Sequence, residues 1–572
     1  MKTIAIPTRK HRIFLPDTLE IDSWQKLETY FLDLEKREIN NLNELEIWLQ
    51  HRSELEAVLE EDLGWRYIKM NIDTTNKELE NSFLFFINEI QPHIAPYEDK
   101  FNRKLIDSPF IKNLDQNQYR IYLRNVKKEI EIFRDENIPL LTKLQTESQK
   151  FGSISAAMTV TLDEEEMTLQ KAARYLKLNE RTKREEAYRK IQQRRLQDKT
   201  ALNHLYTDLI SIRHQVAQNA GFKNFRDYMF TSMGRFDYTV QDCFNFHSAV
   251  KQNIIPITNQ FDAERKEKLK LESLRPWDLE VDTSGKEPLK PFENGNDLLE
   301  KTIQCFTKLR PYFGECLSIM KEMGHLDLES KKGKAPGGFN YPLYEIGVPF
   351  IYMNAVGTHR DLVTMVHEGG HAIHSFLTKD LELTPFKSFP SEVAELASMS
   401  MELLSMEHWD IFFEDEEELK RAKREQLQKV LETLPWVATI DKFQHWIYEN
   451  PTHSVEERYA TWKNLMNDFG SNIVDYSGLE EEYANTWQKQ LHLFEVPFYY
   501  IEYGFAQLGA IAVWRNFKQN KEKALDQYMA ALSLGYTKSI GEIYQTAGIR
   551  FDFSPEYVKE LADFVKAELI KI

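Results

Sequence analysis

The chain has 572 residues, 42% hydrophobic and 28% charged, which is ordinary globular usage and excludes a disordered or fibrous protein. Asp and Glu number 90 against 73 Lys and Arg, a net charge of −17, so we expect no nucleic-acid partner, because phosphate binding needs a basic surface. No apolar run reaches the length of about 18 residues that a transmembrane helix requires, and the N-terminus lacks a signal-peptide core, so we expect no membrane association.

The three cysteines, Cys243, Cys305 and Cys316, are few, odd in number and without C-x-x-C spacing. They indicate neither a disulfide framework nor a thiolate zinc site, and they fit a reducing compartment. We therefore expect a soluble protein of the cytoplasm, and no feature of the sequence points to an obligate protein partner.

Helical patterns dominate the chain up to residue 330. A helix is expected over residues 21–40, where Asp22 and Ser23 are good capping residues and apolar side chains follow at helical spacing. Charged helices are expected over residues 42–63, 163–178 and 182–220, the last ending before Gly221. Heptads are not sustained, so packed bundle helices are favoured over a coiled coil.

Two segments interrupt this pattern. Residues 275–296 contain three prolines and several turn dipeptides and are predicted to be an ordered loop or a domain connection. After the Gly- and Lys-rich residues 331–338, residues 339–344 and 348–354 indicate a β-hairpin, because the second segment is β-branched and aromatic. From Thr358 the helical pattern returns almost to the C-terminus, so the expected fold class is mainly α with one small β-sheet.

The string HEGGH, from His367 to His371, is the motif with the clearest chemistry. Its helix is expected to begin after Thr358, with Asp361 completing a capping box. His367 and His371 are one turn apart, so both imidazoles can bind one metal ion. Glu368 is rotated by about 100° from His367, beside the metal, where a general base for a bound water molecule belongs.

The same string can arise by chance on a solvated helix, but its apolar helix opposes that interpretation, because unpaired charge is expensive there. Gly369 and Gly370 cost about 1 kcal/mol each relative to Ala, which suggests that another segment approaches closely. His374 lies on the same face but rises about 10 Å from His367, too far to share a metal ion, so we expect a buried, hydrogen-bonded histidine. The metzincin pattern needs a histidine where Leu377 stands, so the third ligand must come from elsewhere.

The best candidate for the third ligand is Glu395, in a helix expected to be capped by Ser391. A second helix that delivers a glutamate gives the two-His, one-Glu set typical of catalytic zinc, with one Zn²⁺ per chain. Glu392 is the rival, although in the first turn its ordinary role is to stabilise the helix dipole or to face solvent. Glu402, two turns after Glu395, is either a hydrogen-bond partner of a ligand histidine or a surface residue.

HEGGHAIH, followed about one helix later by AELASMSME, resembles the thimet oligopeptidase and oligoendopeptidase F family of zinc peptidases. The segments at residues 223–238 (KNFRDYMFTSMGRFDY) and 491–514 (LHLFEVPFYYIEYGFAQLGAIAVW) are similar to its bacterial oligoendopeptidase F and Pz-peptidase branch. These blocks lie between residues 223 and 553, whereas the first 200 residues carry no matching motif.

The resemblance implies a mainly helical, two-lobed metallopeptidase with a deep channel, which hydrolyses internal bonds of short peptides. It implies that residues 1–200 form a helical wall of this channel and that residues 201–572 carry the zinc site. By motif position, the zinc ligands and the base carry over as His367, His371, Glu395 and Glu368.

The Tyr-rich segment carries over less directly, because thimet-type members have a Gly-Tyr loop where this chain has the helix-like PFYYIEYG. Within it, Pro497 is expected to begin a helix that places Tyr499 and Tyr503 one turn apart. These two tyrosines and His492 are candidates for contacts to the substrate and the oxyanion, with Tyr500 as the alternative. Aromatic core packing is the competing role for each of them.

Three other functions remain open from the sequence. A helical zinc carboxypeptidase would share the zinc site but would trim single residues. A non-enzymatic peptide-binding protein derived from a peptidase would be expected to lose a zinc ligand or the base, and all of them are present. A helical scaffold protein would need no buried zinc.

Overall fold

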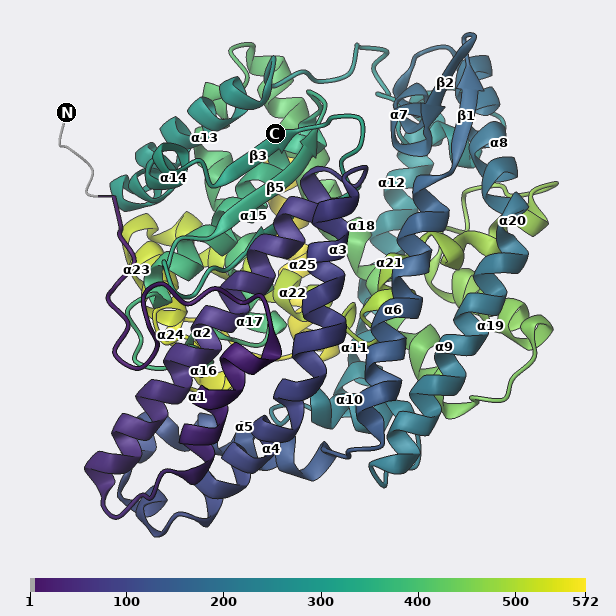
Figure 1. Cartoon of the computed structure of the whole chain (residues 1–572). Helices are drawn as coiled ribbons and strands as arrows, with labels where there is room; N and C mark the ends of the chain where they lie inside the picture. The colour runs from purple at the N-terminus through teal and green to yellow at the C-terminus, as the bar shows by residue number, and fades with distance from the viewer. Residues whose placement is uncertain (1–5) are drawn as a thin grey trace.

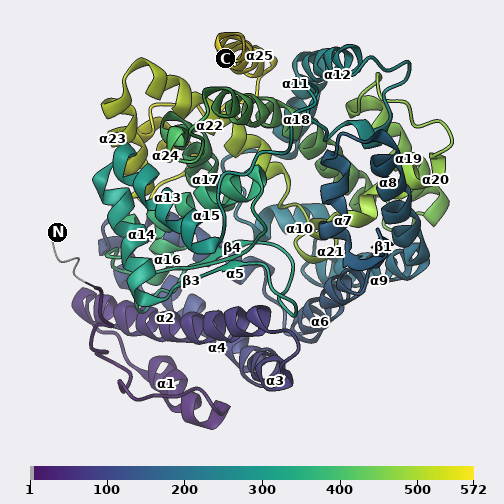
Figure 2. The ribbon, with the colours of Figure 1, turned by 90° about the horizontal axis from the view of Figure 1, so that it is seen from above.

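The computed structural model describes residues 6–572 and is mainly helical with two small β-sheets, which confirms the predicted fold class (Figure 1). The first helices are α1 (Trp24–Lys36), α2 (Leu42–Ile72), α3 (Lys77–Phe85), α4 (Gln91–Asp107), α5 (Gln116–Ile132) and α6 (Asn137–Ala156). Helices α1 to α5 bury a hydrophobic cluster that includes Trp48 and Phe101 and is completed by Leu383 and Phe386 from later in the chain. Seen from above, α1 to α4 lie along one side of the molecule (Figure 2).

A β-hairpin lies where a helix over residues 163–178 is predicted. β1 (Thr159–Leu162) pairs antiparallel with β2 (Glu165–Thr168), and only then does the short helix α7 (Leu169–Ala173) begin. The prediction is wrong because the two turn residues between the strands have positive φ angles of 48° and 65°, which match the twist of a hairpin. The charged residues of this segment are compatible with a helix, but the turn and the burial of alternate side chains favour strands.

The predicted helix over residues 182–220 is two helices, α8 (Arg181–Gln197) and α9 (Lys199–Asn219), which are separated at Asp198. The middle of the chain continues with α10 (Phe225–Ser232), α11 (Val240–Asn253), α12 (Ile255–Lys268), α13 (Gly295–Leu309) and α14 (Pro311–Met323). The later helices are α15 (His359–Thr378), α16 (Thr384–Lys387), α17 (Ser391–Ser405), α18 (Glu416–Glu449), α19 (Val455–Phe469), α20 (Glu480–Asn485), α21 (Leu491–Glu495), α22 (Ile501–Gln519), α23 (Lys521–Leu532), α24 (Ile540–Thr546) and α25 (Pro555–Lys571). Within residues 6–572, none of the helices combines the length and the apolar character needed to cross a membrane.

The second sheet has three strands in the order β3 (Leu326–Glu329), β5 (Phe350–Ala355), β4 (Phe339–Tyr341). β4 and β5 are antiparallel and pair Phe339 with Tyr352, which confirms the predicted hairpin. β3 joins the other side of β5 in parallel, a long-range pairing that the sequence pattern does not predict. In the described part of the chain, β4 pairs only with β5 and leaves one strand edge unpaired.

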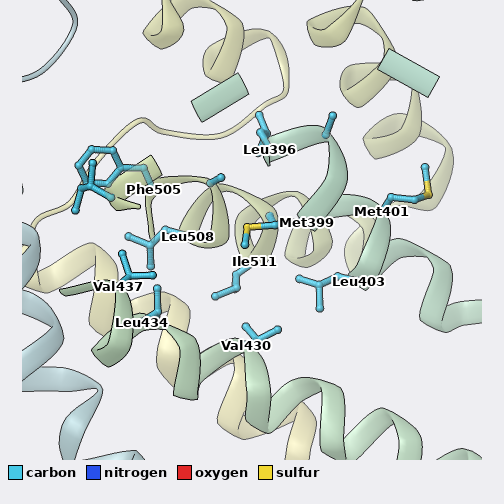
Figure 3. Packing of buried hydrophobic residues seen from close by; sticks show 14 of the residues in the cluster. Leu396, Met399, Met401, Leu403, Val430, Leu434, Val437, Phe505, Leu508 and Ile511 are labelled. Carbon is cyan, nitrogen blue, oxygen red and sulfur yellow. The ribbon is translucent and has the colours of Figure 1, made fainter. Parts of the chain in front are cut away.

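The centre of the molecule is the packing of α17 between α15 and α22, with α18 against α22. α15 begins with the predicted capping box, in which the Thr358 side chain accepts from the Asp361 N–H and Asp361 accepts from Thr358. Buried side chains that meet in this core include Leu396, Met399, Leu403, Val430, Leu434 and Ile511 (Figure 3). α17 is therefore enclosed on most of its sides, and polar side chains on it must find partners inside the protein.

Two glycines allow α15 to approach its neighbours closely. A Cβ atom added at Gly370 would lie 2.7 Å from the Ala397 carbonyl oxygen and from Ser398 Cα on α17. A Cβ atom at Gly369 would lie 2.7 Å from the Phe306 ring of α13. The close approach expected from two mid-helix glycines is therefore present, and at Gly370 it is made by helix backbone, which cannot move aside like a flexible side chain.

Gly370→Ala should lower the free energy of unfolding by about 1–3 kcal/mol or more, because the new methyl group overlaps the α17 backbone. Gly152→Ala on α6 is the matched control, since no atom lies within 4 Å of a Cβ atom there, and it should stabilise the protein by up to about 1 kcal/mol. Denaturant unfolding of both variants makes the comparison. Equal stability of Gly370→Ala and the parent chain would contradict the close packing of α15 on α17.

Candidate active site

The contact between α15 and α17 brings the three predicted metal ligands together. His367 Nε2 lies 3.3 Å and His371 Nε2 3.7 Å from the same oxygen, Glu395 Oε2. The three ligand atoms lie within 4.8 Å of one another. Two imidazoles and a carboxylate are the donor set of catalytic zinc sites, so these residues fit a metal ion of that class.

A second carboxylate, that of Glu402, contacts the predicted ligand His367. His367 Nδ1 lies 2.7 Å from Glu402 Oε1, so an Nδ1–H donated to Glu402 leaves Nε2 free to bind a metal. Gln426 Nε2 on α18 donates to the other Glu402 oxygen at 2.7 Å. Glu402 is therefore the hydrogen-bond partner of a predicted ligand histidine, one of the two roles that the sequence left open for it. The role of Gln426 could not be predicted, because it lies on another helix and belongs to no motif.

Glu395 is also held from two sides. The Tyr499 hydroxyl donates to Glu395 Oε1 at 2.8 Å, and Ser398 Oγ donates to Oε2 at 2.9 Å. Burial alone would raise the pKa of Glu395, but the hydrogen bond from His367 and the charges of His371 and His367 lower it to about 2. Glu395 is therefore an anion, as a metal ligand must be.

The two histidines differ in their protonation. Burial lowers the pKa of His371 to about 4, so its imidazole is neutral and able to bind a metal. Burial also opposes protonation of His367, but hydrogen bonds to Glu395 and Glu402 outweigh it and hold its pKa well above the ordinary value. Metal binding at His367 therefore releases a proton.

Glu368 is buried beside the ligand set, with 5% of its surface exposed. Burial raises its pKa to about 7, and the negative charge of Glu395 acts in the same direction. Among the described residues, its Oε2 atom has no hydrogen-bond partner. A carboxyl group with a free oxygen and a pKa in this range can accept and return a proton.

The aromatic residues predicted near the site cluster together. Tyr499 and Tyr503 have ring centroids 5.3 Å apart, and the His492 ring is 4.8 Å from the Tyr500 ring. His492 Nε2 lies 3.4 Å from the Tyr503 hydroxyl, while its Nδ1 is 2.7 Å from Gln490 Nε2. Of the two tyrosines, only Tyr499 makes a hydrogen bond to a predicted metal ligand.

The helix predicted to start at Pro497 begins later. α22 starts at Ile501, and residues 497–500 form a turn in which Phe498 has a φ of +67°. Its N–H donates to Gln444 Oε1 at 2.5 Å, and its carbonyl oxygen accepts from Arg235 Nη2. This left-handed backbone is strained by about 1–3 kcal/mol and persists because these contacts hold it.

Arg235 was not among the predicted site residues, although it lies in the segment 223–238 that carried the family resemblance. Besides the Phe498 carbonyl oxygen it binds Glu502 Oε1 at 2.9 Å. Both side chains are almost fully buried, so the pair fixes the start of α22 relative to α10 and the turn that follows it. The position of Tyr499 therefore depends on a residue far upstream.

Two further residues that the sequence analysis weighed near the motif, Glu392 and His374, lie outside the group of three predicted ligands. Glu392 is 2% exposed and its Oε1 accepts from the Tyr238 hydroxyl at 2.6 Å, so the solvent-facing role considered for it is wrong. His374 is buried as expected and stacks on Phe389 with ring centroids 3.5 Å apart. Neither of its ring nitrogens has a hydrogen-bond partner among the described residues, so the expected hydrogen bond is not present.

A cavity of about 830 Å³ lies between the N-terminal helices and the segment that precedes α17. Its lining includes Arg52, Glu56 and Tyr122 on one side and Tyr344 and Phe389 on the other. It extends to Pro390, which directly precedes the helix of Glu395, but the three predicted ligands do not line it.

Comparison with known proteins also indicates a metal-dependent peptidase, in agreement with the donor set of the site. The model of peptidase family M3 matches residues 174–563, and the model of the peptidase M3 N-terminal domain matches residues 14–150. The chain is 24% identical over 548 residues to an oligoendopeptidase F homolog of Borreliella burgdorferi, covering 91% of this chain and 88% of that one. It is 25% identical over 323 residues to the oligopeptidase PepF of Bacillus subtilis, covering 55% of this chain and 46% of that one.

The solved structure of a Pz peptidase A with an inhibitor superposes with a TM-score of 0.92 at 25% identity, covering 97% of this chain and 98% of that one. Fold, site and relatives thus define a metalloendopeptidase. Because the family model matches well over half of its residues, the chain belongs to peptidase family M3.

Glu395→Gln should lower the affinity for a divalent metal ion, measured with Zn²⁺, by more than about 100-fold, because a charged ligand is lost. Glu392→Gln is the matched control on the same helix and should keep its metal, since Glu392 binds Tyr238 instead. Metal content after dialysis against a chelator of known affinity compares them. Loss of metal from Glu392→Gln alone would show that the third ligand is misassigned.

Proposed function

We propose that the chain is a zinc-dependent endopeptidase that hydrolyses internal bonds of short peptides. One observation carries the proposal: His367, His371 and Glu395 bring three ligand atoms within 4.8 Å of one another, with Glu368 beside them on the same helix as the histidines. This donor set leaves coordination positions for water and substrate. Membership of peptidase family M3 and relatives named as oligoendopeptidases support the same function.

When bound, zinc would activate a water molecule and polarise the carbonyl group of the scissile bond. Glu368 takes the proton of the attacking water and then gives it to the leaving amine. Its burial supports this role, because a pKa of about 7 allows the carboxylate both to accept and to return a proton near neutral pH. Glu402 and Gln426 keep His367 in the tautomer that presents Nε2 to the metal.

Negative charge develops on the carbonyl oxygen during attack, and a nearby O–H or N–H group can stabilise it. We assign this role to Tyr503 and His492, whose hydroxyl group and Nε2 atom lie 3.4 Å apart. In the part of the chain that the structure describes, neither group makes a hydrogen bond to a predicted metal ligand, so both are free to contact the substrate. Tyr499 donates to Glu395, so its proposed role is to orient the metal ligand.

Glu368→Gln should retain about one zinc ion per chain but lose most of the turnover, because only the proton acceptor is removed. The amide is nearly the same size as the carboxyl group, so the fold should be unchanged. Metal analysis and steady-state kinetics on the same preparation separate the two effects. Near-normal turnover of this variant would exclude Glu368 as the base.

Tyr503→Phe should lower kcat by about 10²-fold with little change in KM, because a donor used in the transition state is lost. Tyr499→Phe should instead weaken zinc binding by about 10-fold, since a contact to a metal ligand is lost. Kinetics at saturating zinc and zinc competition with a chelator distinguish the two variants. The reverse pattern would exchange the two roles, and unchanged values in both would assign the tyrosines to core packing.

We also propose that residues 1–200 form one wall of a channel that leads to the site. The cavity of about 830 Å³ between the N-terminal helices and the segment before α17 supports this arrangement. The unpaired edge of β4 can hydrogen-bond to an extended peptide backbone without regard to its side chains. Such a channel admits an extended chain and excludes a folded domain, so selection is steric.

We also propose a cytoplasmic location. The three buried cysteines, which form no disulfide, are consistent with it.

A peptide of about ten residues, roughly 33 Å long when extended, should be cut at internal bonds, whereas a folded protein should remain intact. Mass spectrometry maps the cut sites, and Glu368→Gln run in parallel excludes a contaminating protease. Removal of zinc with a chelator should abolish cleavage. Release of single C-terminal residues only would favour a carboxypeptidase, binding without cleavage would favour a peptide-binding protein, and efficient cleavage of the folded protein would contradict the channel.

A further inference from the structure

A second cluster of metal-binding residue types is buried between α11 and α18. Cys243 and His247 lie on α11, and Asp441 and His445 lie on α18. All four residues are at most 2% exposed. None of them belongs to the site described above.

The atoms of this cluster are close enough to hold one metal ion. Ligand atoms of Cys243, Asp441 and His445 lie within 4.8 Å of one another, the same limit that the set around Glu395 meets. His445 Nε2 lies 3.2 Å and His247 Nε2 2.8 Å from Asp441 Oδ2. In the described residues, these two groups of three are the ones that meet this limit.

The cluster lacks a cation of its own. Among the described residues, no Lys or Arg forms an ion pair with Asp441, although burial of an unpaired carboxylate is expensive.

Several polar atoms in the cluster also have no hydrogen-bond partner among the described residues. They are Asp441 Oδ1, His247 Nδ1 and both ring nitrogens of His445, whose Nε2 lies near Asp441 Oδ2 but outside hydrogen-bond geometry. Buried polar groups nearly always have a hydrogen-bond partner or a bound ion, so these unpaired atoms indicate that the cluster binds a further group. A metal cation would use the unpaired ligand atoms and supply the missing positive charge.

We propose that Cys243, Asp441 and His445 bind a second metal ion of the zinc class, distinct from the active-site metal. A divalent ion is balanced by one thiolate and one carboxylate, with both imidazoles neutral. The Cys243 thiol loses its proton to solvent as the metal–sulfur bond forms. A thiolate and an imidazole select zinc or cobalt over magnesium or calcium, which prefer oxygen ligands only. His247 holds the ligand carboxylate by its hydrogen bond.

The position of the cluster points to a structural role. Its residues are almost fully buried, which disfavours access by a substrate, and the three side chains leave one position of a four-coordinate ion for a water molecule. Gln444, next to His445, accepts the N–H of Phe498 in the turn that carries Tyr499. A metal that joins α11 to α18 would therefore fix the helix on which this turn depends.

The two sites differ in one measurable property, because only the second has a sulfur ligand. The full-length protein is expressed in cobalt-supplemented medium, since fully buried ligands take up metal during folding. The parent chain should hold about two Co²⁺ ions and His371→Ala about one, and both should have a thiolate-to-Co²⁺ charge-transfer absorption band. Cys243→Ser should hold about one ion and lack the band.

Cys316→Ser is the matched control, because Cys316 is equally buried at 1% exposure but lies outside both groups of ligands. It should keep both ions and the band. About one ion in the parent chain, none in His371→Ala and no thiolate band in either would overturn the proposal and leave a hydrogen-bonded core cluster. The spectra of the parent chain and His371→Ala decide this even if Cys243→Ser fails to fold. The band is independent of peptidase activity, so failure of the proposed function would appear separately, as loss of turnover or of the first metal.

Discussion

The site depends on how closely α15 can approach α17. Two histidines on one helix supply two ligands, so a catalytic metal site of this type needs a carboxylate from another element. The absence of a side chain at Gly370 lets the α17 backbone at Ala397 and Ser398 take the space that a methyl group would fill. This contact sets Glu395 3.3 Å from His367 Nε2, so one interface between two helices joins the separate parts of the motif.

α18 organises the surroundings of that interface. Near its start, Gln426 binds Glu402, which in turn binds His367. Near its end, Gln444 holds the strained turn at Phe498, next to the tyrosine that contacts Glu395. One long helix thus supports both the predicted metal ligands and the aromatic residues beside them. α18 also contacts α11 through a buried cluster in which Asp441 pairs with histidines and, among residues 6–572, with no lysine or arginine.

Local patterns predict those parts of the fold whose structure is set by neighbours in sequence. The helix of His367 follows from its capping box and its apolar stripe, and the β4–β5 hairpin follows from two short strand-forming segments. The pattern fails at residues 163–178, where a turn of two left-handed residues overrides helix-compatible charge. It fails again at Pro497, because Phe498 takes a left-handed backbone that contacts from Arg235 and Gln444 stabilise.

By itself, the sequence determined the helix that carries both histidines, their spacing on it and the glutamate of a following helix, and so predicted the types of metal ligand. Those features are local, because helical periodicity fixes which residues share a face. Only the tertiary structure decided that Glu392 faces Tyr238, that Tyr499 holds Glu395, and which side chain binds Glu402. These contacts join residues on different helices, and helix faces that are buried on most sides carry no periodic signal that would indicate their neighbours.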